Sequence, residues 1–400
     1  MSGLRAQRLA ARRAARRRAV GRGVAVAAAS LVVAVGTATG MLSALDDGGG
    51  SDEARPAPVS GSPYAAPSSP SAVPSASGPA PSATSVRSSA KASVSPSPGK
   101  AGPGSAKART TKAARLYRHP SSQVLDWVRD NPGDRRAEVI ASRIADRPAA
   151  VWFADHTPAT ITSRVRAVTS GGAAQGRVPV VVAYAIPDRD CGGASQGGAP
   201  DLGAYDAWID RFAAGLGSRE VVVVLEPDSI AQSECLSAAA RADRFASLAR
   251  AGRVLKAANP RARVYYDAGH SGWRPAAEQA ALLKQAGAAS AASSDGIFSN
   301  VSNFHTTSAE IAYDRQVLAA LGGPSSLGAV IDTSRNGNGA PPDGEWCDPA
   351  GRKIGRPPTL DTGEPRIDAY LWVKLPGESD GCKGTPGTFS PSYAYELAAP

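Results

Sequence analysis

The sequence is poor in the residues that build metal centres. Its 400 residues include four Cys and four His, no two Cys form a C-x-x-C pair, and the His residues are scattered. This spacing is not that of a zinc site. A Gly-rich phosphate loop is absent, and the segment Gly269–Trp273 (GHSGW) is not a G-x-S-x-G nucleophile turn. The sequence therefore predicts no metal and no cofactor.

A positively charged folded region is also lacking. The total charge is +10, but residues 1–115 hold 16 Lys and Arg against four acidic residues, a net charge of +12. Residues 116–400 therefore carry a net charge of −2. Because the basic residues are concentrated in a tail, the charge gives no reason to expect a nucleic-acid partner.

Three regions differ in composition. Arg5–Arg22 contains eight Arg and Gly23–Leu45 contains no charge, so residues 1–45 are predicted to be a signal peptide or a membrane anchor. Residues 46–115, rich in Ser, Pro, Ala and Gly, are predicted to be a disordered linker. We expect the remaining domain, residues 116–400, outside the cell, secreted or tethered through residues 23–45. An even Cys count behind an export signal suggests two disulfides.

From residue 116 onward, apolar runs alternate with amphipathic helices. The helical spacing is clearest in residues 161–168, 205–216, 245–255 and 311–321. Seven β-α units in about 285 residues predict a single, barrel-like α/β domain. The predicted strands are Ala149–Phe153, Val178–Tyr184, Val221–Leu225, Arg263–Tyr266, Gly296–Ser299, Leu327–Ile331 and Ala369–Val373.

The segment Val221–Asp228 (VVVVLEPD) is the most informative of these. Five apolar residues without alternation are typical of a strand buried on both faces, as in a parallel sheet covered by helices. Pro227 should end the strand because it has no backbone N–H. Asp228 would then lie just beyond the carboxyl end, where parallel α/β folds place catalytic groups. A single Asp there could equally cap a helix or pair with an Arg. The residues that follow the other strands must therefore distinguish a catalytic Asp228 from a structural one.

Polar residues follow six of the predicted strands, which indicates a lined cleft. Splitting an acetal requires a protonated carboxyl and a carboxylate, and crowding of several Asp raises the pKa of at least one. Indole faces can stack on sugar rings; the alternative is core packing, which we expect for Trp127 and Trp208. The carboxylates and tryptophans assigned to the cleft are Asp190, Asp228, Asp267, Asp380, Trp152, Trp273, Trp346 and Trp372.

Seven segments carry a family resemblance: PDRDC, LEPDSI, YYDAGHSGW, SNVSNF, VIDTSRNGNG, EWCDPAGRKIG and DAYLWVKLPGESDGC. In this order, they resemble the signature segments of glycoside hydrolase family six, the inverting cellulases. The resemblance covers nearly all of residues 116–400. It implies a distorted, incomplete (β/α) barrel of about seven parallel strands with an open cleft at their carboxyl ends. It also implies hydrolysis of a β-1,4-glucan with inversion.

The resemblance also implies roles for individual residues. Asp228 is the general acid, and Asp190 is the neighbour that keeps it protonated and helps to organise water. Asp380 is the candidate base, and Tyr184 lies near the distorted sugar at the cleavage point. The predicted substrate-binding residues are Trp152, Asp267, His270, Trp273, Asn303, Trp346, Lys374 and Glu378.

Two disulfides, Cys191–Cys235 and Cys347–Cys382, are implied by the same resemblance, each beside a catalytic Asp. Two positions depart from the family. The serine that holds the catalytic water is represented by Ser195 or, in another register, by Gln196. Phe304 stands where Tyr is more usual, which removes a hydroxyl. Neither departure removes a carboxylate, so we expect an active enzyme.

The segment between Cys347 and Cys382 is short and leaves little room for a roof over the cleft. An open cleft admits internal positions of a chain, so we predict a monomeric endoglucanase. One alternative is an exo-acting cellobiohydrolase of the same family. The other is a catalytically impaired glucan-binding protein of the cell surface.

Overall fold

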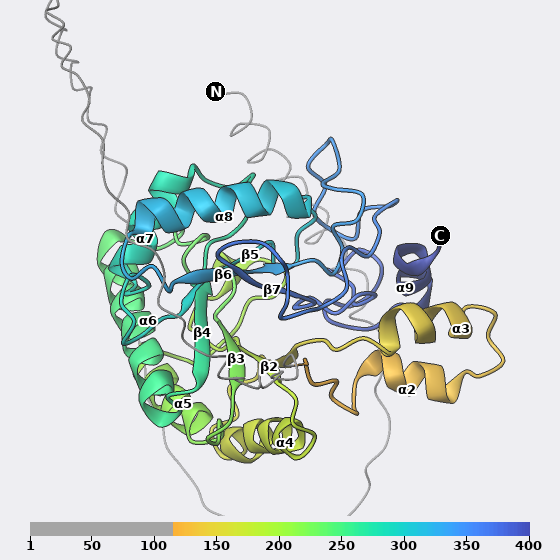
Figure 1. Cartoon of the computed structure of the whole chain (residues 1–400), viewed down its shortest axis with the longest axis horizontal. Helices are drawn as coiled ribbons and strands as arrows, with labels where there is room; N and C mark the ends of the chain where they lie inside the picture. The colour runs from red at the N-terminus through yellow and green to blue at the C-terminus, as the bar shows by residue number, and fades with distance from the viewer. Residues whose placement is uncertain (1–114) are drawn as a thin grey trace, which may run out of the picture. The chain divides into compact units, whose positions relative to one another are not determined.

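The structure is a computed structural model that describes residues 115–400. All seven predicted strands form one parallel sheet, in which each strand is hydrogen-bonded to its neighbours in sequence. The sheet curls into a half-barrel (Figure 1), which confirms the expected distorted, incomplete barrel. The strands are β1 Val151–Phe153, β2 Val180–Ala183, β3 Val221–Leu225, β4 Ala262–Asp267, β5 Gly296–Ser299, β6 Gly328–Asp332 and β7 Ile367–Leu371. The predicted export segment, residues 1–45, lies outside the described residues, as does the predicted linker apart from residue 115.

A helix follows each of the first five strands, and α5 to α8 line one side of the sheet in sequence order (Figure 1). The sixth connection, residues 333–366, contains no helix, so the prediction of seven regular β-α units is wrong at this point. None of the helices within residues 115–400 is long and apolar enough to cross a membrane. The five helices are α4 Ile161–Ala174, α5 Leu202–Ala213, α6 Ala238–Ala258, α7 Ala276–Gln285 and α8 Thr307–Leu321.

Three further helices pack together beside β7, on the other side from α6 and α7 (Figure 1). They are α2 Gln123–Asp130, α3 Ala137–Ile140, which continues into the turn Ala141–Ala145, and α9 Pro391–Ala398. Ser122 caps α2 by accepting a hydrogen bond from the Leu125 amide at 3.4 Å. Helices from the N-terminal and C-terminal parts of the described chain thus pack together on one flank of the sheet.

Strand β3 is buried on both faces, which explains its unbroken apolar sequence. Val221, Val223 and Leu225 belong to the cluster between sheet and helices. Val222 and Val224 belong to the cluster inside the curl, together with Tyr265 and Phe298. Because side chains alternate along a strand, both surfaces of β3 must be apolar. The interpretation of Val221–Leu225 as a doubly buried strand is confirmed.

Two hydrogen bonds join the edges of the sheet. The Ala150 amide donates to the Trp372 carbonyl at 2.9 Å, and Trp152 Nε1 donates to the Val373 carbonyl at 2.7 Å. Residues at the start and end of the curl are therefore in contact, although no ladder pairs β1 with β7 in the described part of the chain. This contact places the Trp152 ring beside the end of β7.

Gly252 tests the packing of α6 on the sheet. A Cβ atom there would lie 2.0 Å from Tyr266 Oη and 2.3 Å from the Ser293 carbonyl oxygen. Ala normally stabilises a helix over Gly by about 1 kcal/mol, but overpacking costs about 1–3 kcal/mol. We therefore expect G252A to lower the Tm.

The matched control is G203A on α5, where a Cβ would meet only one atom, the Asp201 Oδ1 that caps the helix, at 3.3 Å. Its Tm in thermal denaturation should equal or slightly exceed that of the wild type. A G252A protein as stable as G203A would show that α6 does not press on Tyr266 and Ser293 as described.

Candidate active site

Asp228 lies directly beyond β3, where Pro227 ends the strand. Its φ is 69°, and that of Glu226 is 51°, so two non-Gly residues of this turn adopt the left-handed region. Such residues are strained and persist only where surrounding contacts hold them. The turn after Asp228 is held by Asp267, the last residue of β4.

Asp267 is only 1% exposed, and backbone amides bind both of its carboxylate oxygens. Oδ2 accepts from the Ile230 and Ala231 amides at 3.1 and 2.8 Å, and Oδ1 accepts from Gly269 at 2.9 Å. The carboxylate therefore fixes the chain that follows Asp228. Asp267, a predicted sugar-binding residue, is therefore buried beneath the turn that follows Asp228 and supports that turn.

The Asp228 carboxyl is surrounded by groups that favour its protonated form. Burial raises its pKa well above the ordinary Asp value, and the negative charges of Asp267 and Asp190 raise it further. No Lys or Arg within residues 115–400 forms an ion pair with Asp228 that would oppose this effect. The Asp228 carboxyl is therefore expected to keep its proton at a pH where an ordinary Asp is ionised.

Ser195 connects the two predicted catalytic residues that follow β2. Its Oγ lies 2.8 Å from Tyr184 Oη and donates to Asp190 Oδ2 at 3.0 Å, and its amide donates to the same oxygen at 2.8 Å. Gln196, the other candidate for this position, is exposed. Burial raises the pKa of the Tyr184 phenol, and the nearby Asp228 charge adds to the shift. Tyr184 therefore remains protonated.

Arg189 and Glu226 fix the loop that carries Asp190. The Arg189 guanidinium lies 4.4 Å from the centre of the Tyr184 ring and donates to the carbonyls of Ala154 and Ser195 at 2.5 and 2.9 Å. The Glu226 oxygens accept from the Ala185 and Ile186 amides, each at 3.0 Å. Burial raises the pKa of Glu226 to about 7, although these amides oppose the shift.

Arg244 and a disulfide join this loop to the segment after Asp228. The buried Arg244 guanidinium donates to the carbonyls of Pro187 at 2.8 Å and Asp188 at 3.2 Å, and it approaches the Ser229 carbonyl at 3.4 Å. Cys191 and Cys235 form one of the two implied disulfides, with Cα atoms 5.8 Å apart. The loops that carry Asp190 and Asp228 are thus held at a fixed separation.

The loops after β4 and β5 present the predicted polar and aromatic contacts. The half-buried rings of His270 and Trp273 have centroids 5.2 Å apart, and the His270 ring also stacks on His305 at 4.3 Å. Asn303 is half-buried and donates to the Val301 carbonyl at 2.9 Å. These side chains lie beyond neighbouring strands at the same edge of the sheet.

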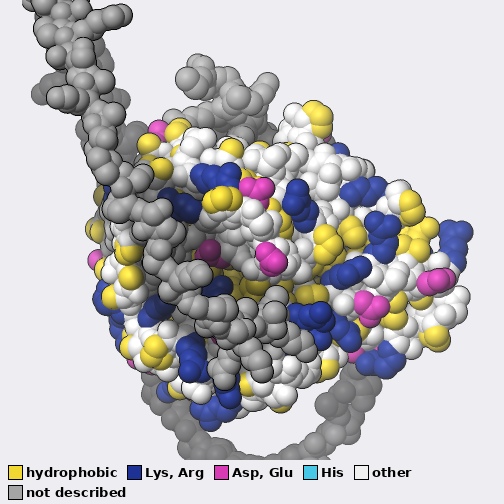
Figure 2. Space-filling view, viewed as in Figure 1, with side chains coloured by type: hydrophobic (Ala, Val, Ile, Leu, Met, Phe, Trp, Pro, Cys, Tyr) yellow, Lys and Arg dark blue, Asp and Glu magenta, His cyan; other side chains and the backbone are white. Residues whose placement is uncertain are grey.

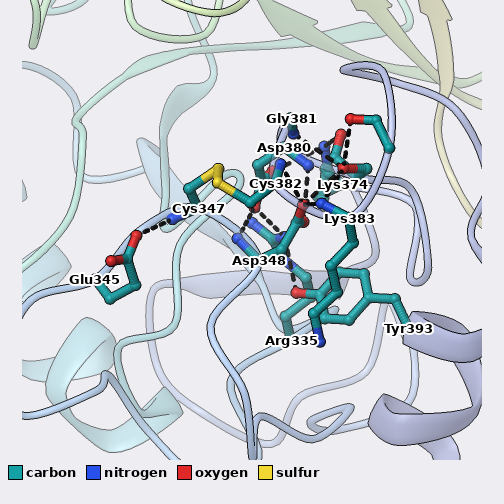
Figure 3. Close-up of a disulfide and its surroundings, with 12 residues drawn as sticks. Arg335, Glu345, Cys347, Asp348, Lys374, Asp380, Gly381, Cys382, Lys383 and Tyr393 are labelled. Carbon is teal, nitrogen blue, oxygen red and sulfur yellow. Dashed lines mark hydrogen bonds and ion pairs between the residues drawn. A yellow bond between two sulfur atoms is a disulfide. The ribbon is translucent and has the colours of Figure 1, made fainter. Parts of the chain in front are cut away.

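Asp380 lies in a cluster of opposite charge (Figure 3). Arg335, which is fully buried, donates to Asp380 Oδ2 at 2.6 Å, and Lys374 Nζ pairs with Oδ1 at 3.0 Å. The Arg335 guanidinium also lies 4.4 Å over the Phe304 ring. Where the family more usually has Tyr, the Phe ring therefore still serves as a platform for this cation.

Asp348 anchors the turn that contains Asp380 (Figure 3). Its Oδ1 accepts from the Asp380 amide at 2.7 Å, and its own amide donates back to Asp380 Oδ2 at 3.2 Å. Its Oδ2 accepts from Ser379 Oγ at 2.6 Å and from the amides of Cys382 and Lys383 at 3.0 and 2.8 Å. The second disulfide, Cys347–Cys382, lies directly beside these bonds, so both implied disulfides are confirmed.

The remaining predicted contacts differ in exposure. Trp152 is half-buried and meets the Tyr184 ring edge-on at 5.2 Å, whereas Trp346 is 54% exposed in the connection before Cys347. Glu378 accepts from Gln123 of α2 at 2.9 Å, and burial raises its pKa to about 7 against the opposing charge of Lys374. Glu378 thus links α2 to the turn that carries Asp380.

Trp372 is not a cleft residue, and its assignment there is wrong. It is 2% exposed, packs with Ile140 and Ile144, and donates from Nε1 to the Arg356 carbonyl at 3.1 Å. The position of Trp372 beyond β7 could not reveal this, because helices distant in sequence cover the side chain.

Sequence reasoning missed four charged residues that shape the site: Arg189, Arg244, Arg335 and Asp348. Arg189 and Arg335 lie within motifs noted in the sequence, next to Asp190 and after β6, so a search for cations near the carboxylates would have found them. Arg244 lies within a helix, and Asp348 contacts residues more than 30 positions away. No local pattern indicates their partners.

The site offers carboxylates, hydroxyls and aromatic rings. Across residues 115–400, no group of three or more His, Cys, Asp or Glu is arranged to hold a metal ion. Figure 2 shows Lys and Arg interspersed with Asp and Glu on the visible face, without a large patch of one sign. A half-barrel with a carboxyl of raised pKa, a hydroxyl-bound carboxylate and aromatic rings at one edge of the sheet is the arrangement that a glycoside hydrolase requires.

Comparison with known proteins gives the family. The family model "Glycosyl hydrolases family 6" matches residues 106–396. Endoglucanase 1 of Streptomyces sp. (strain KSM-9) is 52% identical over 297 residues, which cover 74% of this chain and 81% of that protein. Endoglucanase A of Thermobispora bispora is 50% identical over 284 residues, 71% of this chain and 61% of the relative.

The solved structures agree. The endoglucanase Cel6 of Mycobacterium tuberculosis, in complex with methyl-cellobiosyl-4-deoxy-4-thio-β-D-cellobioside, has a TM-score of 0.66 and 38% identity. The match covers 72% of this chain and 97% of that structure. The chain belongs to glycosyl hydrolases family 6 and is a cellulase.

Substitution of Asp348 tests the turn around Asp380. In D348N an amide group replaces an oxygen that accepts N–H donors, and hydrogen bonds to a charged group contribute about 1.5–3 kcal/mol each. We expect the free energy of unfolding to fall by at least about 2 kcal/mol at pH 7. D361N, an exposed substitution in the same connection, should change it little.

The difference in free energy of unfolding between wild type and D348N should depend on pH. Although burial opposes the shift, hydrogen bonds from Ser379 and three amides lower the pKa of Asp348. Its contribution is therefore complete above the unfolded value near 4 and is lost as pH falls through the lower folded value. Urea denaturation at pH 7 and in acid should show wild type and D348N converging; a constant difference would contradict this account.

Proposed function

We propose that the enzyme hydrolyses internal β-1,4-glucosidic bonds of cellulose-type glucans with inversion and that Asp228 is its general acid. The half-buried Asp228 carboxyl, crowded by Asp190 and Asp267, carries the proposal. A carboxyl that retains its proton can donate it to the glycosidic oxygen as the bond to the anomeric carbon breaks. The two endoglucanase relatives support attack within the chain over release of cellobiose from its ends.

Inversion also requires a water molecule on the opposite face of the sugar and a group that accepts its proton. The Ser195 hydroxyl contacts Tyr184 and Asp190 and is suited to orient this water. We assign the Asp190 carboxylate as the group that receives the proton. Asp380 is the alternative base, but Arg335 and Lys374 occupy its oxygens, so we assign it the role of fixing charge and loop position.

We propose two kinds of substrate contact. Trp152, Trp273 and Trp346 supply aromatic faces on which sugar rings stack. His270, Asn303, Lys374 and Glu378 supply hydrogen-bonding groups at the rim. Asp267 we reassign to positioning Asp228, since backbone amides bind both of its oxygens.

We further propose that the catalytic domain, residues 116–400, acts as a monomer outside the cell. Residues 1–45 would direct export or anchor the chain in the membrane, and residues 46–115 would form the linker. The basic segment followed by an uncharged one supports export. The two disulfides support an oxidising compartment.

The first test is D228N, which keeps the shape of the side chain but cannot donate a carboxyl proton. We expect hydrolysis of a soluble cellulose derivative to fall by a factor of about 100–10,000, the usual contribution of general acid catalysis. D243N, which changes an exposed Asp of α6, is the matched control and should retain wild-type activity. Full activity of D228N would remove Asp228 as the acid.

The same assay separates the modes of attack. In an internal mode, wild-type enzyme lowers viscosity well before many reducing ends appear. Loss of viscosity only in proportion to reducing ends would instead indicate the exo-acting alternative. A folded wild-type protein with no hydrolysis at all would favour the glucan-binding alternative.

The pH dependence of catalysis tests the electrostatic argument. Because the pKa of Asp228 is raised, kcat/KM should fall with increasing pH only well above the ordinary Asp value near 4. In D190N a negatively charged neighbour is lost, so the pKa of Asp228 decreases and the fall in kcat/KM moves to lower pH. The residual kcat/KM of D190N, measured across pH, should show this shift. If kcat/KM falls at the same pH in D190N and wild type, the charge of Asp190 does not raise the pKa of Asp228.

A further inference from the structure

Two buried acids on α8 are not used by the proposed reaction. Glu310 and Asp314 are one helical turn apart, and both are 0% exposed. No ion pair with Lys or Arg compensates either carboxyl within residues 115–400. Two ionised carboxylates in such a position would be strongly disfavoured.

Each acid has one oxygen bound to a donor and one without. Glu310 Oε1 accepts from the Ser271 amide at 2.9 Å, and Asp314 Oδ2 accepts from Ser299 Oγ at 3.0 Å. Glu310 Oε2 and Asp314 Oδ1 are buried and have no hydrogen-bond partner among the described residues. Ser299 Oγ donates to Asp314, and the four-residue spacing of the two acids on α8 places both carboxyl groups on the same helix face.

A single proton resolves this pattern. An ionised carboxylate only accepts hydrogen bonds, whereas a protonated carboxyl also donates one. A proton held between Glu310 Oε2 and Asp314 Oδ1 would satisfy both buried atoms and remove one negative charge. The spacing of the two residues on one helix face suits such a contact.

We propose that Glu310 and Asp314 share one proton and that Glu310, through the Ser271 amide, positions the loop that carries His270 and Trp273. The positioning of the loop rests on the proposed function, since it concerns substrate binding. The shared proton does not depend on that function. Glu310 is thus a positioning residue that acts on the sugar only through this loop.

The surroundings favour Asp314 as the acid that holds the proton. Burial raises the pKa of both groups, and the charge of Glu310 raises that of Asp314 further. The Ser271 amide stabilises negative charge on Glu310. The other titratable or charged groups nearby are Tyr313 on α8, Asp267 on β4, Arg274 after Trp273, and His270 and His305 in the adjoining loops.

Proton linkage tests the shared proton without any activity assay. In E310Q or D314N the amide supplies the hydrogen between the two side chains, so the folded protein needs no extra proton. Wild type should then lose stability as pH rises from the unfolded value near 4 towards the raised folded value, releasing one more proton on unfolding than either variant. Titrating groups that do not interact with Glu310 or Asp314 are common to all the proteins, so they cancel in the comparison.

The measurement is the free energy of unfolding against pH from denaturant titrations. The double variant E310Q/D314N has no titrating group at this position. It provides the reference slope of the free energy of unfolding against pH. If the single variants have the same slope as the wild type, Glu310 and Asp314 do not share a proton, because the two acids then titrate independently. A double variant with the wild-type slope would show that no proton is held.

Steady-state kinetics test the positioning role. E310Q retains an acceptor for the Ser271 amide, whereas E310M has a similar volume and no acceptor. We expect E310M to raise KM about tenfold, the equivalent of one lost hydrogen bond to a charged group, with a smaller effect on kcat. E310Q should keep the wild-type KM.

These outcomes separate the two proposals. If folded E310M keeps the wild-type KM, Glu310 does not position the loop. If wild type hydrolyses no β-1,4-glucan, the proposed function fails, while the proton-linkage result still decides whether the acids share a proton. A cooperative unfolding transition confirms that each variant is folded before its kinetics are compared.

Discussion

The active site depends on the different electrostatic environments of its carboxyl groups. Asp228 is desolvated beside two other Asp and forms no ion pair with Lys or Arg among residues 115–400, whereas Asp380, beyond β7, is held by Arg335 and Lys374. The first environment raises the pKa of a carboxyl, and the second surrounds a carboxyl with positive charge. Divergent environments of this kind support the acid and supporting roles that we propose for residues of one type.

Strained backbone is concentrated along the same rim. Left-handed φ values occur at Asp190, Asp228, Asn300 and Asp348, each just beyond a strand or within a connecting loop. Each strained residue costs about 1–3 kcal/mol, which neighbouring contacts must offset. The Asn300 side chain, for example, binds the Asp332 carbonyl at 2.9 Å and the His305 amide at 3.0 Å. The polar contacts at the rim therefore determine where the catalytic groups lie.

The sequence predicted most of the sheet because its signals are local. Val221–Leu225 is apolar throughout, and the structure buries all five residues. The helix-free connection 333–366 escaped prediction because its structure comes from distant contacts, such as those of Asp348 with the 379–383 turn. The same limit explains the error at Trp372. The motifs identified the family and both disulfides, but they could not show that amides occupy Asp267 or that Ser195, rather than Gln196, contacts Asp190.

Two Gly-rich loops each contain a Cys of one of the two disulfides, and this has a physical reason. Residues 191–198 and 376–387 offer few apolar side chains, so burial of hydrophobic surface cannot fix them. A disulfide limits the conformations of such a loop before folding is complete, but it leaves many arrangements of the intervening residues open. The bonds from Asp348 to the Asp380 turn, and from Asp190 to Ser195, select one of these arrangements. Covalent closure therefore restricts each loop, and the carboxylate–amide bonds select one arrangement of it.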